Sequence, residues 1–367
     1  MPVPSPLSVT IPTTETTSTD VSALMQQNGP FSANPQLVIL TCLLITALLT
    51  IAYVAAEIIL PLILAFVLHL LFQPAMRLLE KLHLPRSLAA FGLVLLFLGL
   101  IVAIGASISG PATAMAEKLP DGLNRIQQRL YFFTEPLQAA QSFLQRIDGK
   151  DPNAVGIGLT GMLFRGTQSF AGGLFETLLV LFFLLVSGDT FLRRLVEVVP
   201  RFSDKRQVVM LSKQIESNVS AYLLTISMMN MLVGIATGAV AWATGLGDAA
   251  FWGVIGFALN YVPIIGPFAG VVILGFTGVA QIPVLWQALL PAGLYLIIHL
   301  IEGEFITPML LARRFTLNPV LVIISLVFWF WMWGIVGAIL AVPLLAIFKI
   351  ICDGIQPLNS IGHFLEG

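Results

Sequence analysis

The sequence predicts an all-α integral membrane protein with about six spanning helices and two re-entrant helical hairpins. Of its 367 residues, 57% are hydrophobic and only 10% are charged, and the mean hydropathy is +0.94. Soluble domains are about 25% charged, so a water-soluble fold of this size could not bury so much apolar surface. The long apolar runs lack the alternation of a membrane β-barrel, which favours helices.

Composition also excludes several classes of function. A formal net charge of −1 gives no footprint for nucleic-acid binding. The two cysteines and four histidines lie too far apart for a metal site, and the sequence contains no Walker loop, GxSxG or HExxH motif. We therefore expect no enzyme, no cofactor, no metal and no nucleic-acid partner; the lipid bilayer is the expected environment.

The N-terminal region begins with a polar tail and continues into apolar sequence. Residues 1–36 are rich in Pro, Ser and Thr, which is typical of a disordered tail. The apolar block that follows is too long for one span, and Glu57 and Pro61 interrupt it. It is interpreted as two helices, 37–56 and 58–73, although one kinked helix remains an alternative.

A short loop and a third span complete the N-terminal transmembrane region, residues 37–109. Residues 73–87 carry three bases and are expected to form the loop, and residues 88–109 the span. The next region, 110–172, is richer in charge, Pro and Gly, with apolar residues at helical spacing in its middle. It is predicted to be a periplasmic region of amphipathic helices, which could contact a partner subunit, lie on the membrane or form a small solvated subdomain.

The remaining spans alternate with basic segments. Residues 173–220 are expected to contain a short span, 173–187, and a basic cytoplasmic loop, 188–220. Spans at 221–245 and 284–301 belong to the predicted transport core, residues 221–352. Residues 353–367 form a C-terminal tail.

Two blocks of this core, 250–281 and 318–349, are each interrupted near the middle. Each would be about 48 Å long as a continuous helix, too long for an ordinary span. Proline and glycine destabilise a helix when they lie in its interior. The interrupting residues are Asn260, Pro263, Gly266 and Pro267 in the first block, and Gly334 and Gly337 in the second. Each block is therefore predicted to be a re-entrant hairpin.

The distribution of charge supports this topology. Short loops rich in Lys and Arg stay in the cytoplasm, and two hairpins place the basic segments 73–87 and 188–220 on one side with Arg313, Arg314 and Lys349. A span followed by a hairpin then occurs twice in opposite orientation. Such inverted repeats are common in secondary transporters, whose substrate site lies where the broken helices meet. A simple tight turn between packed helices is the alternative explanation for each break.

Several stretches also resemble a known family. "YVPIIGPFAG", "IEGEFITPMLLARRFTLNPVLVIISL" and "WGIVGAILAVPLLAIFKI" are similar to signature regions of the AI-2E family transporters. "ILPLILAFVLHLLFQPAMRLLEKLHLPRSLAA" resembles the N-terminal region of that family. The resemblance implies a multi-pass permease of the bacterial inner membrane, a homo-oligomer that moves a small hydrophilic solute such as a quorum-sensing signal. Some family members are linked to sodium–proton exchange instead.

The chain departs from the family pattern at two places. The residues "FWFWMW" fill positions 328–333, where glycines are frequent in the family. Asn318 precedes Pro319, where the family often has histidine, so this chain lacks a titratable group there.

The residues predicted to line the solute pathway lie in the motifs and at the breaks. They are Asn260, Pro263, Gly266, Pro267, Glu302, Pro308, Asn318, Pro319, Gly334 and Gly337.

Two acidic residues are candidates for coupling to an ion. Carboxylates near the bilayer are costly and indicate function. Glu302 ends an apolar span one turn after His299, and Glu57 lies between two apolar helices. An interfacial ion pair for Glu302 and a helix cap for Glu57 are the alternatives. The sequence thus favours a secondary transporter, with a cation/proton antiporter or a passive channel as the other possibilities.

Overall fold

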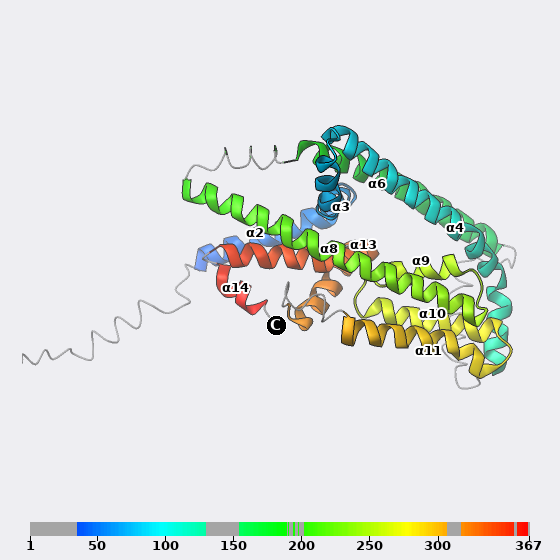
Figure 1. The fold of residues 1–367 in the computed structure, drawn as a ribbon. Helices are drawn as coiled ribbons and strands as arrows, with labels where there is room; N and C mark the ends of the chain where they lie inside the picture. Colours follow the sequence, from blue (N-terminus) through cyan, green and yellow to red (C-terminus); the bar gives the residue numbers. More distant parts are fainter. Residues whose placement is uncertain are drawn as a thin grey trace, which may run out of the picture. The chain divides into compact units, whose positions relative to one another are not determined.

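The computed structural model describes residues 35–129, 154–188, 202–306, 317–355 and 358–365, with residues 190, 194 and 197 between them. The regular elements of this part of the chain are helices (Figure 1). They are α2 (Pro35–Val54), α3 (Ala56–Lys81), α4 (Arg86–Arg129), α6 (Ala154–Ser187), α8 (Phe202–Thr244), α9 (Ala249–Leu259), α10 (Ile265–Gln281), α11 (Leu285–Ile301), the π-helix η2 (Glu302–Ile306), α13 (Pro319–Gly354) and α14 (Asn359–Phe364).

The helices confirm the predicted all-α membrane class. By length and composition alone, five of those described could cross a membrane, α13 among them, and shorter apolar helices accompany them. Large hydrophobic side chains are exposed along most of these helices. A water-soluble protein would bury such surfaces, whereas lipid tails can cover them.

Helix α2 belongs to a unit of its own that ends at Ala55, and the described helices from Ala56 onward form a second unit. The hydroxyls of Thr46 and Thr50 in α2 each donate to the backbone carbonyl four residues earlier, at 2.8 Å. These bonds satisfy polar groups that lipid cannot hydrate. The helix ends before Ala55, so the apolar block does form two helices rather than one.

Helix α3 is longer than the sequence analysis predicted. It includes Pro61 and Pro74 and continues to Lys81, so the expectation of a loop over 73–87 is wrong except at the turn before Arg86. Met76, only 1% exposed, packs in a core cluster with residues of α4 and α6. Tertiary packing of this kind outweighs the cost of a proline inside the helix.

The charged segments beside the predicted spans are also largely helical. Residues 202–220, expected as part of a loop, form the first half of α8. Helix α4 continues to Arg129 and α6 begins at Ala154, so helix is confirmed at both ends of the predicted extramembrane region. Residues 130–153 and the N-terminal tail lie outside the described residues, and the placement of this region beyond the membrane stays a prediction.

Two core clusters include α3, and one of them joins it to the transport core. The first lies between α3, α4 and α6 and includes Ala65, Ala90 and Leu181. The second joins α3 to α8 and α13 through residues such as Leu70 and Leu340. Helix α3 is therefore the element that both clusters share.

Small residues bring α8, α9, α10 and α11 into close backbone contact. A Cβ atom at Gly238 would lie 2.7 Å from the carbonyl oxygen of Ala249, and one at Gly278 would lie 2.0 Å from that of Ala288. Without a hydrophobic driving force in lipid, such close packing is what holds membrane helices together. The two arms of the first hairpin are thereby fixed to α8 and α11.

The predicted first break is confirmed. Helix α9 begins with Asp248, whose carboxylate accepts the N–H of Phe251 at 2.9 Å, and ends at Leu259. The chain turns through residues 260–264, where Ile264 has a φ of 66°. Gly266, at the start of α10, lies so close to Leu259 that an added Cβ would be 1.8 Å from its carbonyl oxygen.

The second break is confirmed as well. Trp333 and Gly334 have non-helical dihedral angles, with a φ of 62° at Gly334, and they divide α13 into two arms. The Ser325 hydroxyl of the first arm donates to the Ala341 carbonyl of the second at 3.0 Å. A Cβ at Gly337 would approach the Trp329 carbonyl oxygen to 2.0 Å. The arms are thus antiparallel and in contact, which defines a hairpin rather than a continuous span.

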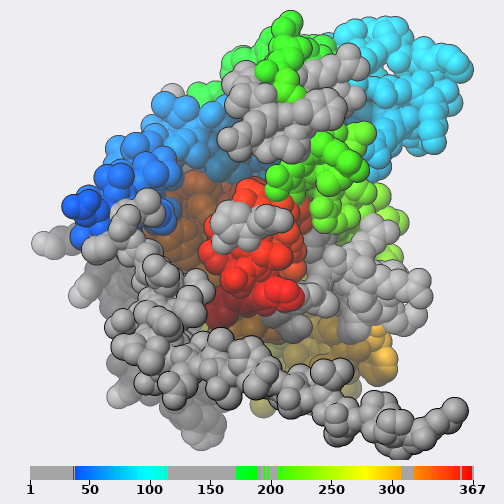
Figure 2. All heavy atoms as spheres, turned by 90° about the vertical axis from the view of Figure 1, so that its left-hand side faces the viewer, coloured from blue at the N-terminus to red at the C-terminus, as the bar shows by residue number. Residues whose placement is uncertain are grey.

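The start and end of this second hairpin lie at the same end of the fold. The backbone N–H of Asn318 donates to the carbonyl of Leu365, directly after α14, at 3.2 Å. Lys349 and Asp353 form an ion pair of 2.7 Å near the end of the second arm. Figure 2 shows this end of the molecule, with the C-terminal segment in red at the surface.

This geometry predicts which positions share a membrane face. In a chain with Cys42 and Cys352 replaced, we expect single cysteines at Val320 and Ser360 to react with a membrane-impermeant thiol reagent from the same side. A cysteine at Gln281, at the base of the first hairpin, should react from the other side. Labelling of Val320→Cys and Ser360→Cys from opposite sides would show that α13 crosses the membrane.

Candidate functional site

The candidate site lies where the two hairpins meet. They approach each other from opposite directions in Figure 1, and Val262, in the first turn, packs against the second hairpin. Its neighbours there include the buried residues Leu326, Ala338 and Ala341. This arrangement agrees with the predicted meeting of two broken helices.

A cluster of neutral polar side chains lies beside the first turn. The Nδ2 group of Asn260 donates to Oδ1 of Asn230 at 2.9 Å, and the Tyr261 hydroxyl donates to Oγ of Ser227 at 2.8 Å. Asn230 is fully buried, and its side chain also interacts with that of Tyr261. Buried amides and hydroxyls are normally hydrogen-bonded, and a cluster of them offers donors and acceptors to a polar ligand.

The local sequence explains how this cluster forms. Ser227 and Asn230 are three residues apart on α8 and therefore share a helix face. Helix α9 ends at Leu259, so Asn260 and Tyr261 are released from the helix beside that face. Sequence reasoning identified Asn260 but missed Ser227, Asn230 and Tyr261. The available signal was the pair of polar residues one turn apart within an apolar stretch.

A second row of polar side chains runs along α11 toward η2. Tyr295 is fully buried against Gly270 of α10, and its ring lies 4.4 Å from that of His299. The Tyr295 hydroxyl and both ring nitrogens of His299 lack hydrogen bonds among the described residues. Nδ1 of His299 is 4.0 Å from a carboxylate oxygen of Glu302, the first residue of the π-helix.

The other predicted site residues occupy distinct positions. Gly266 and Gly337 are buried at the two breaks, with Pro263 and Pro267 half-buried at the first. Asn318 caps α13 by accepting the N–H of Val320 at 3.0 Å, and Pro319 is the first residue of that helix. Both therefore lie at the base of the second hairpin, away from its turn. Glu57 is exposed in the first turn of α3, and Pro308 lies outside the described residues.

These features define a multi-pass α-helical membrane protein in which two helical hairpins make an apolar contact beside a polar cluster, and broken helices of this kind are common in secondary transporters. The chain belongs to the AI-2E transporter family, because residues 40–356 match the sequence model of that family, described as "AI-2E family transporter". It is thus a membrane transport protein.

Individual relatives cover most of the chain. The "AI-2 transport protein TqsA" of Escherichia coli (strain K12) is 30% identical over 325 residues, which span 85% of this chain and 90% of TqsA. The "Putative transport protein YueF" of Bacillus subtilis (strain 168) is 27% identical over 309 residues, or 79% of this chain and 82% of YueF. These matches confirm the family resemblance seen in the motifs.

Proposed function

We propose that this chain is a secondary transporter that binds a small hydrophilic solute between its two hairpins and exposes it alternately to each side of the bacterial inner membrane. The observation that carries the proposal is the cluster of uncharged polar side chains at the first break, where Asn260 bonds the buried Asn230 and Tyr261 bonds Ser227. Irregular backbone at this depth is tolerated only where it is buried in protein or lines a cavity.

The side chains of this cluster indicate the chemistry of the solute. Amides and hydroxyls donate and accept hydrogen bonds without carrying charge, so they suit a neutral, hydroxylated molecule. A quorum-sensing signal of this kind is our first candidate, since one relative is named as an AI-2 transport protein. We further propose that the chain acts as a homo-oligomer, with residues 110–172 in the periplasm.

Transport into proteoliposomes tests this proposal. Vesicles containing the purified chain and loaded with unlabelled autoinducer-2 should take up the labelled signal by counterflow, and the initial rate should saturate with concentration. A channel would show neither saturation nor counterflow. No uptake of this or other small hydroxylated solutes would contradict the proposal.

A cation/proton antiporter is the second candidate, favoured by the buried His299 beside Glu302. In that case Glu302, rather than the exposed Glu57, would carry the coupled ion, because a carboxylate can exchange a cation for a proton. We then expect Glu302→Gln to abolish sodium-driven proton flux in a sodium-jump assay with a pH dye. The matched variant Glu304→Gln, two residues away and exposed, should retain it. Equal flux in both variants would exclude this role of Glu302.

A further inference from the structure

A polar cavity of about 320 Å³ lies at the end of α3, away from the hairpins. Three cationic residues line it: Arg77 from α3, Arg86 at the start of α4 and Lys213 from α8. Two carboxylates, Glu80 and Glu216, also line it. The cavity therefore carries one more positive than negative formal charge.

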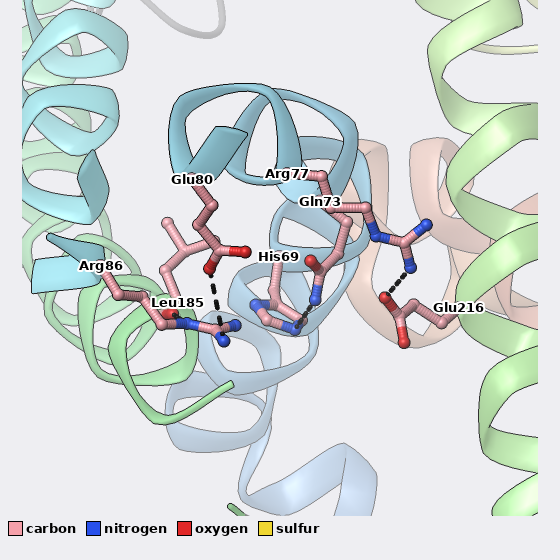
Figure 3. A network of polar contacts seen from close by, with 7 residues as sticks. All are labelled: His69, Gln73, Arg77, Glu80, Arg86, Leu185 and Glu216. Carbon is pink, nitrogen blue, oxygen red and sulfur yellow. Dashed lines mark hydrogen bonds and ion pairs between the residues drawn. The ribbon is translucent and has the colours of Figure 1, made fainter. Parts of the chain in front are cut away.

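Each carboxylate has an arginine partner (Figure 3). Arg77 reaches across from α3 to form an ion pair with Glu216 of α8. Nη1 of Arg86 lies 3.4 Å from Oε1 of Glu80. The Nε group of Arg86 donates to the Leu185 carbonyl of α6 at 2.9 Å. In the described part of the chain, no carboxylate lies within 4.0 Å of the Lys213 ammonium. The surplus positive charge is therefore that of Lys213.

Neutral donors complete the lining. Gln73 is only 8% exposed, and its Nε2 lies 3.0 Å from Nε2 of His69. Ser217 also lines the cavity, together with Lys213 and Glu216 of α8. Each guanidinium has five N–H donors in a planar fork, more than its carboxylate partner uses, and this fork matches the oxygens of a phosphate.

The position of the cavity indicates where its ligand comes from. Apolar stretches of α3 and α4 lead to this turn, so the cavity lies at the end of two membrane helices. Short segments rich in Lys and Arg stay on the cytoplasmic side, and basic pockets between helices there bind anionic lipid head groups. This places the surplus positive charge at the depth of the lipid phosphates.

We propose that this cavity binds a phosphate group, carried either by an anionic phospholipid or by a free phosphate, through Lys213, Arg77 and Arg86. The site is separate from the hairpins, and it does not depend on which solute the chain transports. Because Glu216 neutralises Arg77, the carboxylate competes with the ligand for the same guanidinium. Removing that carboxylate should therefore strengthen binding, whereas a purely structural ion pair would only lose stability.

The test uses the full chain purified in neutral detergent and titrated with two probes, short-chain phosphatidylglycerol and inorganic phosphate, with binding followed by calorimetry. We expect Lys213→Gln to weaken binding by about tenfold and Glu216→Gln to strengthen it by about tenfold. Lys81→Gln removes the same charge from an exposed position outside the cavity and should change binding by less than about twofold. Elution of each variant as a single symmetric peak in size-exclusion chromatography verifies that it is folded.

The two probes distinguish the sources of the phosphate. Binding of phosphatidylglycerol alone identifies a lipid site, and binding of inorganic phosphate alone identifies a site for a free anion. Binding of both, with the same response to Lys213→Gln, identifies the phosphate itself as the recognised group. The proposal is overturned if neither probe binds, or if Lys213→Gln and Lys81→Gln behave alike.

Discussion

Replacing Gly266 by alanine is expected to open the first hairpin and abolish transport. The new Cβ would lie 1.8 Å from the carbonyl oxygen of Leu259, which belongs to the backbone and cannot rotate away. Relief of such overpacking costs about 3 kcal/mol, which corresponds to roughly a hundredfold change in the population of the closed turn. The measurements are the initial rate of solute uptake and the temperature of unfolding in detergent.

Gly275→Ala is the matched control for this change. Gly275 lies on the same helix, but its added Cβ would be 3.6 Å from the Cβ of Ala292, an ordinary van der Waals contact. We expect this variant to keep its stability and its transport. Normal transport by Gly266→Ala would show that the close approach to Leu259 is not required for function.

Separating the Asn230–Asn260 pair should produce the second large effect, this time on solute affinity. Asn260→Ala removes the 2.9 Å hydrogen bond and leaves the amide of Asn230 buried without it, at a cost of about 1–3 kcal/mol. If both amides bind the solute, the KM for uptake should rise by about tenfold in each single variant. In the double variant, the free energy lost from solute binding should be smaller than the sum of the losses in the two single variants, because the two residues act as one unit.

The double-mutant cycle therefore separates binding from stability. Asn359→Ala, which changes an exposed asparagine at the start of α14, should leave the KM unchanged. A pair that only stabilises the turn would lower the amount of folded protein and leave the KM of the remaining protein as it was. That outcome would remove the amide cluster from the solute pathway.

The sequence predicted the architecture where local chemistry decides it. Proline and glycine near the middle of two overlong apolar blocks indicated the breaks, and both breaks lie where they were expected. The separation of α2 from α3 was predicted because the apolar block is longer than one helix needs to cross a bilayer. The break lies at Ala55, two residues before the predicted position at Glu57. Proline alone was a poor guide in α3, where packing of Met76 keeps the helix intact past Pro74.

Contacts between segments far apart in the sequence could not be predicted in the same way. Asn260 was identified from its place in the turn, but its partner Asn230 is 30 residues away on another helix. No periodicity reveals such a pair before the fold is known. Asn318 likewise stood out as a residue before proline, whereas the structure gives it the role of a helix cap at the hairpin base. The charged half of α8 was missed because a helix that extends beyond an apolar span leaves no signal in hydropathy.

The different attachments of the two hairpins have a mechanical consequence. The arms of the first are packed tightly on α8 and α11 by close backbone approaches at Gly238 and Gly278. The arms of the second are bonded to each other through Ser325 and Ala341, are secured near Leu365, and pack on α3 and α8 around Leu340. Helix α8 therefore contacts both hairpins, and we expect any displacement of α8 to be transmitted to both of them.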